Sequence, residues 1–342
     1  MSHIAIGMKL REGPWGGGNQ FGRALARDLF GRGARVSHDL NAPDLDLIVL
    51  TDPRRELESV AFTDHEIWRY LARRNRRALV VHRINECDER KGTRGMNARL
   101  LRANLCADHT VFVASWLRDL FVARGLPCRS TSVILNGSDA SIFNSEGCQR
   151  WDGQAPLRIV THHWGGHWLK GFDIYQRLDE MIGAPPYQGR LAFTYIGNLP
   201  QGFSFRNASH IPPTSGRDLA ALLRQHHVYL TASQFEPGGH HQNEGALCGL
   251  PLLYRESGCM PEYCGGFGVC FTPDDFEEKL CEMMRTYAYW AARMKDYPHT
   301  AERMCSEYHA LFEHLLSRRE EILRARRPWR RLRWLWAGVC AR

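Results

Sequence analysis

Long apolar runs are missing from this sequence of 342 residues. None approaches the roughly 18 consecutive apolar residues that a membrane-spanning helix requires. The first residues, 1–7, do not place an apolar stretch after a basic one, which argues against a secretory signal peptide. The mean hydropathy of −0.40 is typical of a globular chain. We therefore expect a cytoplasmic protein of about two domains, because domains usually comprise roughly 100–200 residues.

Cysteine pairs with zinc-ligand spacing are also missing. The eleven cysteines are scattered along the chain, and no two of them have C-x2-C spacing. The sequence therefore indicates neither a zinc ribbon nor a disulfide framework, and it fits a reducing compartment. The histidines His162, His163 and His167 have no thiolate or carboxylate at ligand spacing. We expect no metal and no cofactor.

Lysine is scarce, with five lysines against forty arginines, so each lysine stands out. The net charge of +8 is concentrated at one end, because residues 318–342 contain nine arginines and two glutamates, a net +7. A nucleic-acid-binding protein would spread its basic residues over a folded face. We therefore expect no nucleic-acid partner for the nearly neutral body of the chain.

Segments typical of strands alternate with segments typical of helices. Strands are expected at 3–8, 34–37, 45–50, 78–82, 110–114, 132–135, 157–161, 191–196, 228–232, 251–254 and 268–271. Such alternation predicts parallel sheets covered by helices on both faces. The pattern lapses near 144–156, as in an interdomain linker. We predict an α/β protein with two Rossmann-like domains facing a cleft, at 1–148 and 149–316, followed by a tail at 317–342.

A glycine-rich loop follows the first expected strand. Gly16, Gly17 and Gly18 precede a helical pattern, and glycines at such a place let backbone amides approach a phosphate group. The dinucleotide fingerprint GxGxxG is not satisfied, because Phe21 stands where its third glycine would fall. A merely flexible loop is the alternative interpretation.

The most informative stretch runs from Thr231 to Pro251. Glu236 follows an expected strand, and Glu244 lies in the next expected helix, with Gly238 and Gly239 between them. Carboxylates accept hydrogen bonds from ligand hydroxyls, and glycines allow the backbone to approach a ligand closely. Because parallel strands bind ligands beyond their carboxyl ends, this stretch predicts a binding site.

These features together resemble the retaining nucleotide-sugar glycosyltransferases of the GT-B fold, the large family four (glycosyltransferase group 1). The resemblance spans positions 16–262. The matching features are the first glycine loop, Val111–Trp116, Asn136-Gly-x-Asp139 with Phe143, Lys170-Gly171, Glu236-x7-Glu244, Gly249–Pro251 and Gly258-x-x-Pro-Glu262. Family four enzymes need no catalytic metal.

The resemblance implies roles for the residues of the second domain. Glu236 would bind hydroxyls of the donor sugar, and Glu244 would bind the nucleotide ribose. The backbone near Gly238, Gly239 and His240 would face the donor sugar.

Lys170 would stabilise the departing diphosphate, together with amides of the first glycine loop. Fixed positive groups favour a transition state in which negative charge develops. The family usually has an arginine about five residues before this lysine, where Gly165 stands here. His163 or His167, if protonated, would be a substitute cation.

The loop after the fourth expected strand is rich in charged residues. The resemblance implies that His82 contacts the donor sugar. We expect Asp88, Arg90 and Lys91 to bind acceptor groups, including a lipid diphosphate. A solvated surface loop is the alternative interpretation.

The tail mixes arginine with Trp329, Trp334 and Trp336, a composition typical of segments that bind anionic membrane surfaces. Packing on the first domain and RNA binding are the alternatives.

The sequence as a whole predicts a cytoplasmic, peripherally membrane-associated glycosyltransferase of the hexosyltransferase type. It would move a sugar from a nucleotide sugar to a glycan or lipid-linked acceptor with retention, in surface polysaccharide biosynthesis. The alternatives are a GT-B sugar-nucleotide epimerase or phosphorylase, and a non-catalytic sugar-binding protein that kept the fold.

Overall fold

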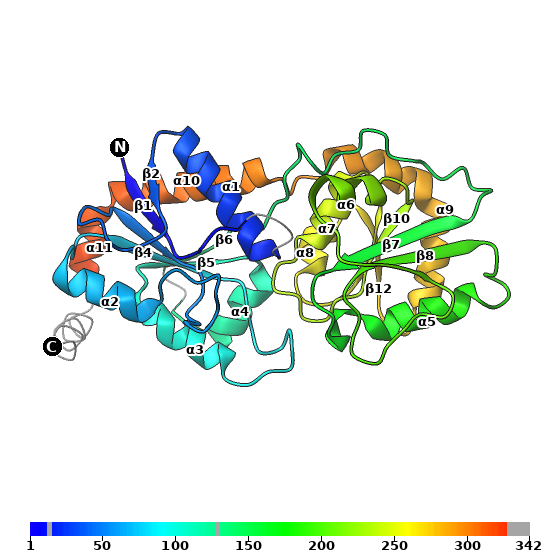
Figure 1. Cartoon of the computed structure of the whole chain (residues 1–342), viewed down its shortest axis with the longest axis horizontal. Helices are drawn as coiled ribbons and strands as arrows, with labels where there is room; N and C mark the ends of the chain where they lie inside the picture. The colour runs from blue at the N-terminus through cyan, green and yellow to red at the C-terminus, as the bar shows by residue number, and fades with distance from the viewer. Residues whose placement is uncertain (12–15, 128–129, 327–342) are drawn as a thin grey trace. The chain divides into compact units, whose positions relative to one another are not determined.

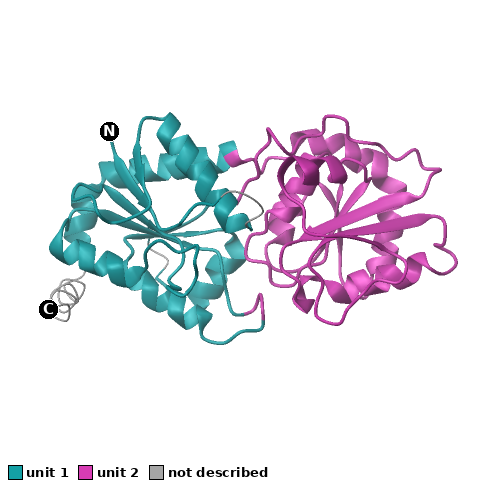
Figure 2. Ribbon diagram, viewed as in Figure 1, with its two compact units in different colours: residues 1–88, 92–135, 302–342 teal, residues 89–91, 136–301 magenta. Residues whose placement is uncertain are grey.

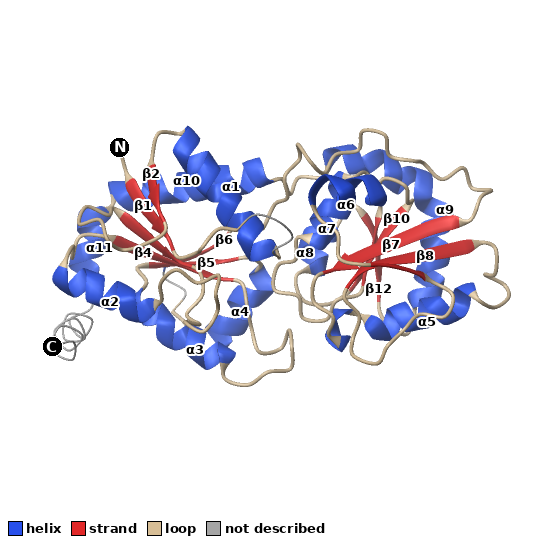
Figure 3. Ribbon diagram, in the orientation of Figure 1, coloured by secondary structure: helices blue, strands red, loops and turns tan. Residues whose placement is uncertain are grey.

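The protein is described here by a computed structural model that covers residues 1–11, 16–127 and 130–326. The chain divides into two compact units (Figure 2). Unit 1 comprises residues 1–88, 92–135 and 302 onward, and unit 2 comprises residues 89–91 and 136–301. Each unit contains a six-stranded sheet with helices around it (Figure 3), which confirms the predicted α/β fold of two Rossmann-like halves.

The sheet of unit 1 has the strand order β2-β1-β3-β4-β5-β6, and every neighbouring pair is parallel. The strands are β1 (His3–Ile6), β2 (Arg35–Ser37), β3 (Leu47–Leu50), β4 (Leu79–Ile84), β5 (His109–Phe112) and β6 (Thr131–Val133). The helices between them are α1 (Gly17–Gly31), α2 (Asp64–Arg73), α3 (Met96–Ala103), the 3-10 turn η1 (Asn104–Cys106) and α4 (Ser115–Ala123). Parallel strands need such helical crossovers.

Successive residues of each strand point to opposite faces of the sheet, and both faces of unit 1 are apolar. On β3, Leu47 and Val49 belong to one core cluster, whereas Ile48 and Leu50 belong to another. The first cluster packs against α1 and the C-terminal helix α10 (Ala301–Ser317), and the second packs against α2. A strand buried on both sides reads as a continuous apolar run, which is the pattern of this sheet.

The C-terminal helices therefore complete the core of unit 1. Tyr308 and Phe312 of α10 are buried beside strands β1, β3 and β4, and Ile322 of α11 (Arg319–Ala325) packs against the same cluster (Figure 1). Just beyond α11, the Arg326 guanidinium makes two hydrogen bonds to the Asp108 carboxylate, at 2.9 and 2.7 Å. The part of the tail up to Arg326 is thus packed on unit 1. Residues 327–342 lie outside the described residues.

The sheet of unit 2 has the order β12-β11-β10-β7-β8-β9 and is also parallel throughout. Its strands are β7 (Leu157–His163), β8 (Leu191–Gly197), β9 (Ser209–Ile211), β10 (Val228–Thr231), β11 (Leu252–Arg255) and β12 (Gly268–Phe271). Its helices are η3 (Trp168–Lys170), α5 (Phe172–Ile182), α6 (Gly216–Leu223), α7 (His241–Leu247), α8 (Met260–Cys264), α9 (Phe276–Arg293) and η4 (Met294–Asp296). Helices α5 and α9 contribute to one apolar core cluster with β7, β8 and β10.

The change from unit 1 to unit 2 comes at Leu135 and Asn136, before the linker that the sequence indicates. Hydrogen bonds explain the difference. The Asn136 amide donates to the Tyr263 hydroxyl at 2.6 Å, and the Arg224 guanidinium donates to backbone carbonyls of Ile142 and Asn144. The stretch before β7 is therefore held by unit 2. Within the described ranges, no helix combines the length and apolar character needed to cross a membrane.

Candidate functional site

The candidate site lies at the carboxyl ends of β7 and β10, which are neighbours in the sheet of unit 2. The connection after β7 carries Lys170, and the connection after β10 carries Glu236. Parallel strands bring such connections together at one edge of a sheet, where open α/β sheets bind ligands. The structure thus brings together two residues that are 66 positions apart in the sequence.

Lys170 and Glu236 form a buried ion pair. Their exposed fractions are 6% and 4%, and the Lys170 ammonium donates a hydrogen bond to the Glu236 carboxylate. Arg90, which belongs to unit 2, places its Nε 3.6 Å from the other Glu236 oxygen. Burial would raise the pKa of Glu236, but the positive charges of Lys170 and Arg90 hold it well below its ordinary value. Glu236 is therefore a carboxylate at any pH near neutrality.

The backbone around Glu236 is strained. Phe235 has a φ of 51°, in the left-handed region that favours glycine. Its amide donates to the Ser257 hydroxyl at 3.0 Å, and the Glu236 carbonyl accepts from the Cys259 amide at 2.9 Å. A Cβ at Gly258 would stand 2.6 Å from the Glu236 backbone nitrogen, so glycine is required there. The turn before α8 thus fixes the conformation that aims Glu236 at Lys170. Strain of this kind concentrates at functional sites.

Glu244 lies on α7 and is held by a histidine of β7. The His162 Nε2 donates to the Glu244 carboxylate at 2.6 Å, and the Tyr229 hydroxyl lies 3.0 Å from His162 Nδ1. The Glu244 carboxylate can only accept, so His162 carries a proton at Nε2. All three side chains are buried. This chain of hydrogen bonds fixes the orientation of Glu244.

A second buried polar network lies under the site. The His163 Nε2 is 2.8 Å from the Tyr175 hydroxyl, and the His241 Nε2 is 2.8 Å from the Thr231 hydroxyl. The two imidazole rings contact each other, with centroids 4.6 Å apart. Burial lowers the pKa of both histidines well below its ordinary value; neighbouring basic groups add to the shift of His163, whereas the Glu236 charge opposes that of His241. Both histidines are neutral. His163 ends β7, and His241 holds the end of β10 by its hydrogen bond to Thr231.

The structure gives no support to His163 or His167 as a second cation. Burial, followed by repulsion from Lys170, lowers the pKa of His167 to about 4, so that this ring is neutral near pH 7. The second positive charge beside Glu236 is Arg90, which the sequence assigned to acceptor binding.

The glycines between the two glutamates are placed by the Asn136-Gly137 motif. The Asn136 side-chain amide donates to the Gly238 carbonyl at 2.7 Å, and the Asn243 side chain donates to the Asn136 carbonyl at 2.8 Å. A Cβ at Gly137 would stand 1.9 Å from the Thr300 carbonyl oxygen, which requires glycine. His240, 8% exposed, comes directly before α7, and the Gly239 carbonyl accepts from Gln242 at 2.7 Å. These hydrogen bonds therefore hold the backbone at Gly238 and Gly239, which the sequence predicts to face the donor sugar.

Gly16, Gly17 and Gly18 form the N-terminus of α1 in unit 1. The helix has no side-chain cap and no acidic residue in its first turn. A Cβ at Gly16 would meet no atom within 4 Å, and one at Gly18 would make an ordinary contact with Met8. Packing among the described residues therefore does not require glycine at position 16 or 18. The first backbone amides of α1 are placed to donate hydrogen bonds to an anion.

His82 lies inside β4 rather than after it, because the strand continues to Ile84. It is fully buried, and its Nδ1 donates to the Asn104 side-chain oxygen at 2.9 Å. Burial lowers the pKa of His82 to about 4, although the hydrogen bond to Asn104 opposes the shift. Its Nε2 is buried and has no hydrogen-bond partner among the described residues, so the contact of His82 with the donor sugar stays a prediction.

Asp88 also has a structural role. Its carboxylate accepts hydrogen bonds from the backbone amides of Met96 and Asn97, at 2.9 and 3.0 Å, and from the Thr93 hydroxyl. Burial would raise its pKa, but these hydrogen bonds lower it. Both oxygens thus cap the start of α3. Lys91 is exposed and, like Arg90, belongs to unit 2.

The sequence did not identify His162, Tyr229 and Asn243 as supporting residues. The His162-His163 pair was visible as a motif, but only the pairing of β7 with β10 shows which carboxylate it contacts. Among the residues that the structure describes, no group of three or more His, Cys, Asp or Glu side chains is arranged to hold a metal ion.

Comparisons with known proteins bear on the fold. No protein-family model matches the chain. No curated protein matches it by sequence either.

Solved structures do match it. Sucrose-phosphate synthase from Thermosynechococcus elongatus is 14% identical, with a TM-score of 0.65 over 93% of this chain and 100% of that one. HepE from Anabaena, in complex with UDP and glucose, is 14% identical, with a TM-score of 0.64 over 92% and 99%. The α,α-trehalose 6-phosphate synthase from Burkholderia multivorans is 13% identical, with a TM-score of 0.57 over 87% and 76%. The chain shares the GT-B fold of these glycosyltransferases.

Proposed function

We propose that this protein is a glycosyltransferase that moves a sugar from a nucleotide sugar to an acceptor, with retention of anomeric configuration. One observation carries the proposal: Glu236, Lys170 and Glu244 lie at one edge of the sheet of unit 2, and all three are buried. Lys170 and Glu236 hold each other by a hydrogen bond, and His162 holds Glu244. The GT-B fold supports it, and HepE, a neighbour of that fold, is a complex with UDP and glucose.

In the proposed reaction, Lys170 stabilises negative charge on the departing nucleoside diphosphate. The Glu236 carboxylate balances the charge of the Lys170 ammonium, and the Arg90 guanidinium beside this pair supplies a second positive charge. A diphosphate that enters finds cations already fixed in place, which favours the transition state over the ground state. The amides of Gly16, Gly17 and Gly18 are proposed as further donors to the diphosphate.

Glu236 is proposed to accept hydrogen bonds from hydroxyls of the donor sugar while it remains ionised. Glu244, oriented by His162, is proposed to accept from the ribose hydroxyls. The backbone near Gly238, Gly239 and His240 would contact the same sugar. Family four chemistry is front-face, so that the diphosphate itself accepts the acceptor proton and no protein nucleophile is required.

The acceptor is proposed to be a glycan or lipid-linked sugar of surface polysaccharide biosynthesis. Lys91 stays a proposed acceptor contact, and Arg90, beside Glu236, is proposed to contact the acceptor where it meets the diphosphate. Asp88 is left out, because its carboxylate caps α3. Residues after Arg326 contain five arginines, three tryptophans and no acidic residue. We propose that they bind an anionic membrane surface.

A panel of nucleotide sugars tests the proposal. Calorimetric titration identifies the base and sugar, nucleoside diphosphate release reports turnover, and NMR of the product reports the anomeric configuration. Inversion would contradict the retaining mechanism, and epimerised or phosphorolysed sugar would favour the other GT-B enzymes. Binding without turnover would favour a sugar-binding protein, and no binding would reject each of these functions.

A further inference from the structure

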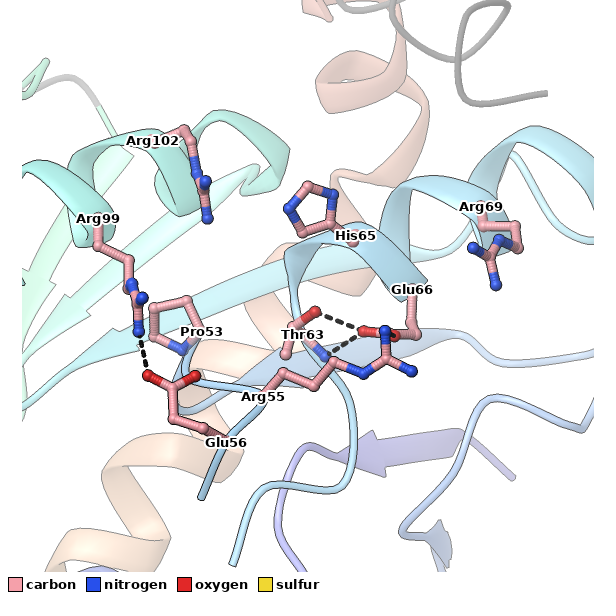
Figure 4. A pocket seen from close by; sticks show the side chains of 9 residues that line it. All are labelled: Pro53, Arg55, Glu56, Thr63, His65, Glu66, Arg69, Arg99 and Arg102. Atoms are coloured by element: carbon pink, nitrogen blue, oxygen red, sulfur yellow. Dashed lines mark hydrogen bonds and ion pairs between the residues drawn. The ribbon is translucent and has the colours of Figure 1, made fainter. Parts of the chain in front are cut away.

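Unit 1 contains a cavity of about 420 Å³ that shares no lining residue with the proposed donor site (Figure 4). This volume is within the range of small-ligand pockets, roughly 300–1,000 Å³. The loop after β3 and the helices α2 and α3 form its walls, and arginine is the commonest residue of the lining. Four arginines line it, at Arg55, Arg69, Arg99 and Arg102.

The basic residues come in pairs from two helices. His65 and Arg69 are one turn apart on α2, and Arg99 and Arg102 are one turn apart on α3. Figure 4 shows Arg99 and Arg102 projecting from α3 on the same side as the loop that carries Arg55. Two guanidinium groups one turn apart, as Arg99 and Arg102 are on α3, destabilise a helix, so helix stability does not explain their arrangement.

The carboxylates of the lining are already engaged. Glu66 completes a capping box at the start of α2, where it accepts from the Thr63 amide at 2.9 Å and from the Thr63 hydroxyl. Glu56 pairs with Arg99. Glu66 also lies 4.0 Å from Arg55, and the buried Asp64 lies 3.9 Å from Arg102. Three carboxylates therefore face four guanidinium groups, and within the described part of the chain no ion pair engages Arg69. The cavity has an excess of positive charge in a protein whose body is nearly neutral.

We propose that this cavity binds the phosphate group of a phosphate-bearing ligand. The guanidinium group matches a phosphate with two parallel hydrogen bonds, and Arg69, which no ion pair of the described residues engages, offers such a group in this cavity. A site for extended RNA would instead need a basic stripe along a face. The proposal rests on unit 1 alone and does not require the proposed transferase activity. The phosphate belongs either to a soluble sugar phosphate or to a lipid headgroup.

The test compares two double variants of the full chain that remove the same charge. Arg69→Gln with Arg102→Gln changes the cavity, and because Arg102 lies 3.9 Å from the buried Asp64 carboxylate, the unfolding free energy of this variant is measured beside the control. Arg206→Gln with Arg217→Gln removes two exposed arginines of unit 2 and serves as the control. The single Arg69→Gln variant keeps the test valid if the double variant does not fold.

The soluble probe is glucose 6-phosphate, with glucose as its blank, titrated by calorimetry at constant ionic strength. The lipid probe is vesicles of phosphatidylglycerol, with phosphatidylcholine vesicles as the blank. The tail is present in every variant, so a difference between the double variants reports the cavity. UDP binding measured on the same variants should not change, which separates this proposal from the donor site.

At least a tenfold weaker affinity in the cavity variant than in the control supports the proposal. Loss of glucose 6-phosphate binding identifies a soluble phosphate ester, and loss of vesicle binding alone identifies a lipid headgroup. Equal affinities of the two double variants for both probes would overturn the proposal, as would no phosphate-dependent binding by the unchanged protein.

Discussion

The Lys170 ammonium donates a hydrogen bond to the Glu236 carboxylate inside unit 2, where both side chains are nearly inaccessible to solvent. A buried ion pair contributes little net stability, because desolvation of two charges offsets their attraction. We therefore interpret the pair as a preformed part of the binding site. When a ligand binds, Lys170 and Glu236 would each replace the contact with the other by a contact with a ligand group. The strained Phe235 before it supports the same interpretation.

The first prediction concerns the stability of this pair. Lys170→Met leaves the Glu236 charge buried without its lysine and should lower the free energy of unfolding by roughly 3–5 kcal/mol. The double variant Lys170→Met/Glu236→Gln should lose less, because no charge is then isolated. Urea unfolding of the wild type, both single variants and the double variant measures the coupling. Additive losses would show that the two side chains do not act as a pair.

The second prediction concerns Glu244. Glu244→Gln should weaken binding of the nucleoside diphosphate by roughly 1–3 kcal/mol, the range for a buried charged hydrogen bond. Glu180→Gln, an exposed position on α5 of the same unit, is the matched control and should bind normally. Calorimetric titration with the diphosphate that the panel identifies gives both affinities. An unchanged affinity for Glu244→Gln would exclude this residue from the nucleotide site.

The third prediction concerns pH. The pKa of His82 is lowered by burial from 6.5 to about 4, so below pH 6.5 the unfolded chain binds a proton that the folded chain refuses. Stability contributed by neutral His82 is complete above pH 6.5 and is lost as the pH falls toward 4. At about 1.4 kcal/mol per pKa unit, the loss approaches 3 kcal/mol at pH 4.

His82→Gln should flatten the fall of the unfolding free energy between pH 6.5 and 4. The absolute stability of the variant does not matter, because the pH slope is the measured quantity. Urea unfolding at several pH values provides it. A slope identical to that of the wild type would mean that His82 is not the buried neutral group described here.

The fourth prediction concerns the C-terminal segment. A chain that ends at Ser317 loses the buried ion pair of Arg326 with Asp108 and the apolar contact of Ile322, and should be less stable. A chain that ends at Arg326 keeps both, and should retain the stability of the full chain. It should nevertheless lose binding to anionic vesicles, since it lacks the remaining arginines and tryptophans.

Co-sedimentation with anionic vesicles at low and high salt compares the full chain with the chain that ends at Arg326. Salt should weaken the arginine contribution, and tryptophan insertion should leave a salt-resistant remainder. Equal binding by the two chains would reject the membrane role of the tail.

Local patterns predicted much of the fold. Alternating strand and helix signals identified eleven of the twelve strands to within about two residues at either end, and missed only β9. The Glu236-x7-Glu244 spacing and the isolated Lys170 identified residues that meet at one sheet edge, because connections after adjacent parallel strands share an edge.

Features that depend on contacts between distant parts of the chain could not be predicted from the sequence. β4 continues two residues beyond its expected end at His82, so this residue lies within the strand and not at its carboxyl end. The sequence does not mark where a strand ends. Asp88 could not be distinguished from a ligand-binding carboxylate, because its capping role depends on where α3 begins. The return of α10 to the core of unit 1 depends on tertiary packing of Tyr308, not on local propensity.

The central claim is that Glu236 belongs to a working nucleotide-sugar site. Nucleoside diphosphate release, followed at a saturating concentration of the best-binding donor, tests it most directly when the wild type is compared with Glu236→Gln. We expect turnover by the wild type and a loss of roughly a hundredfold or more in kcat for the variant, with donor affinity changed much less. Full activity of Glu236→Gln, or a wild type that binds no nucleotide sugar, would contradict it.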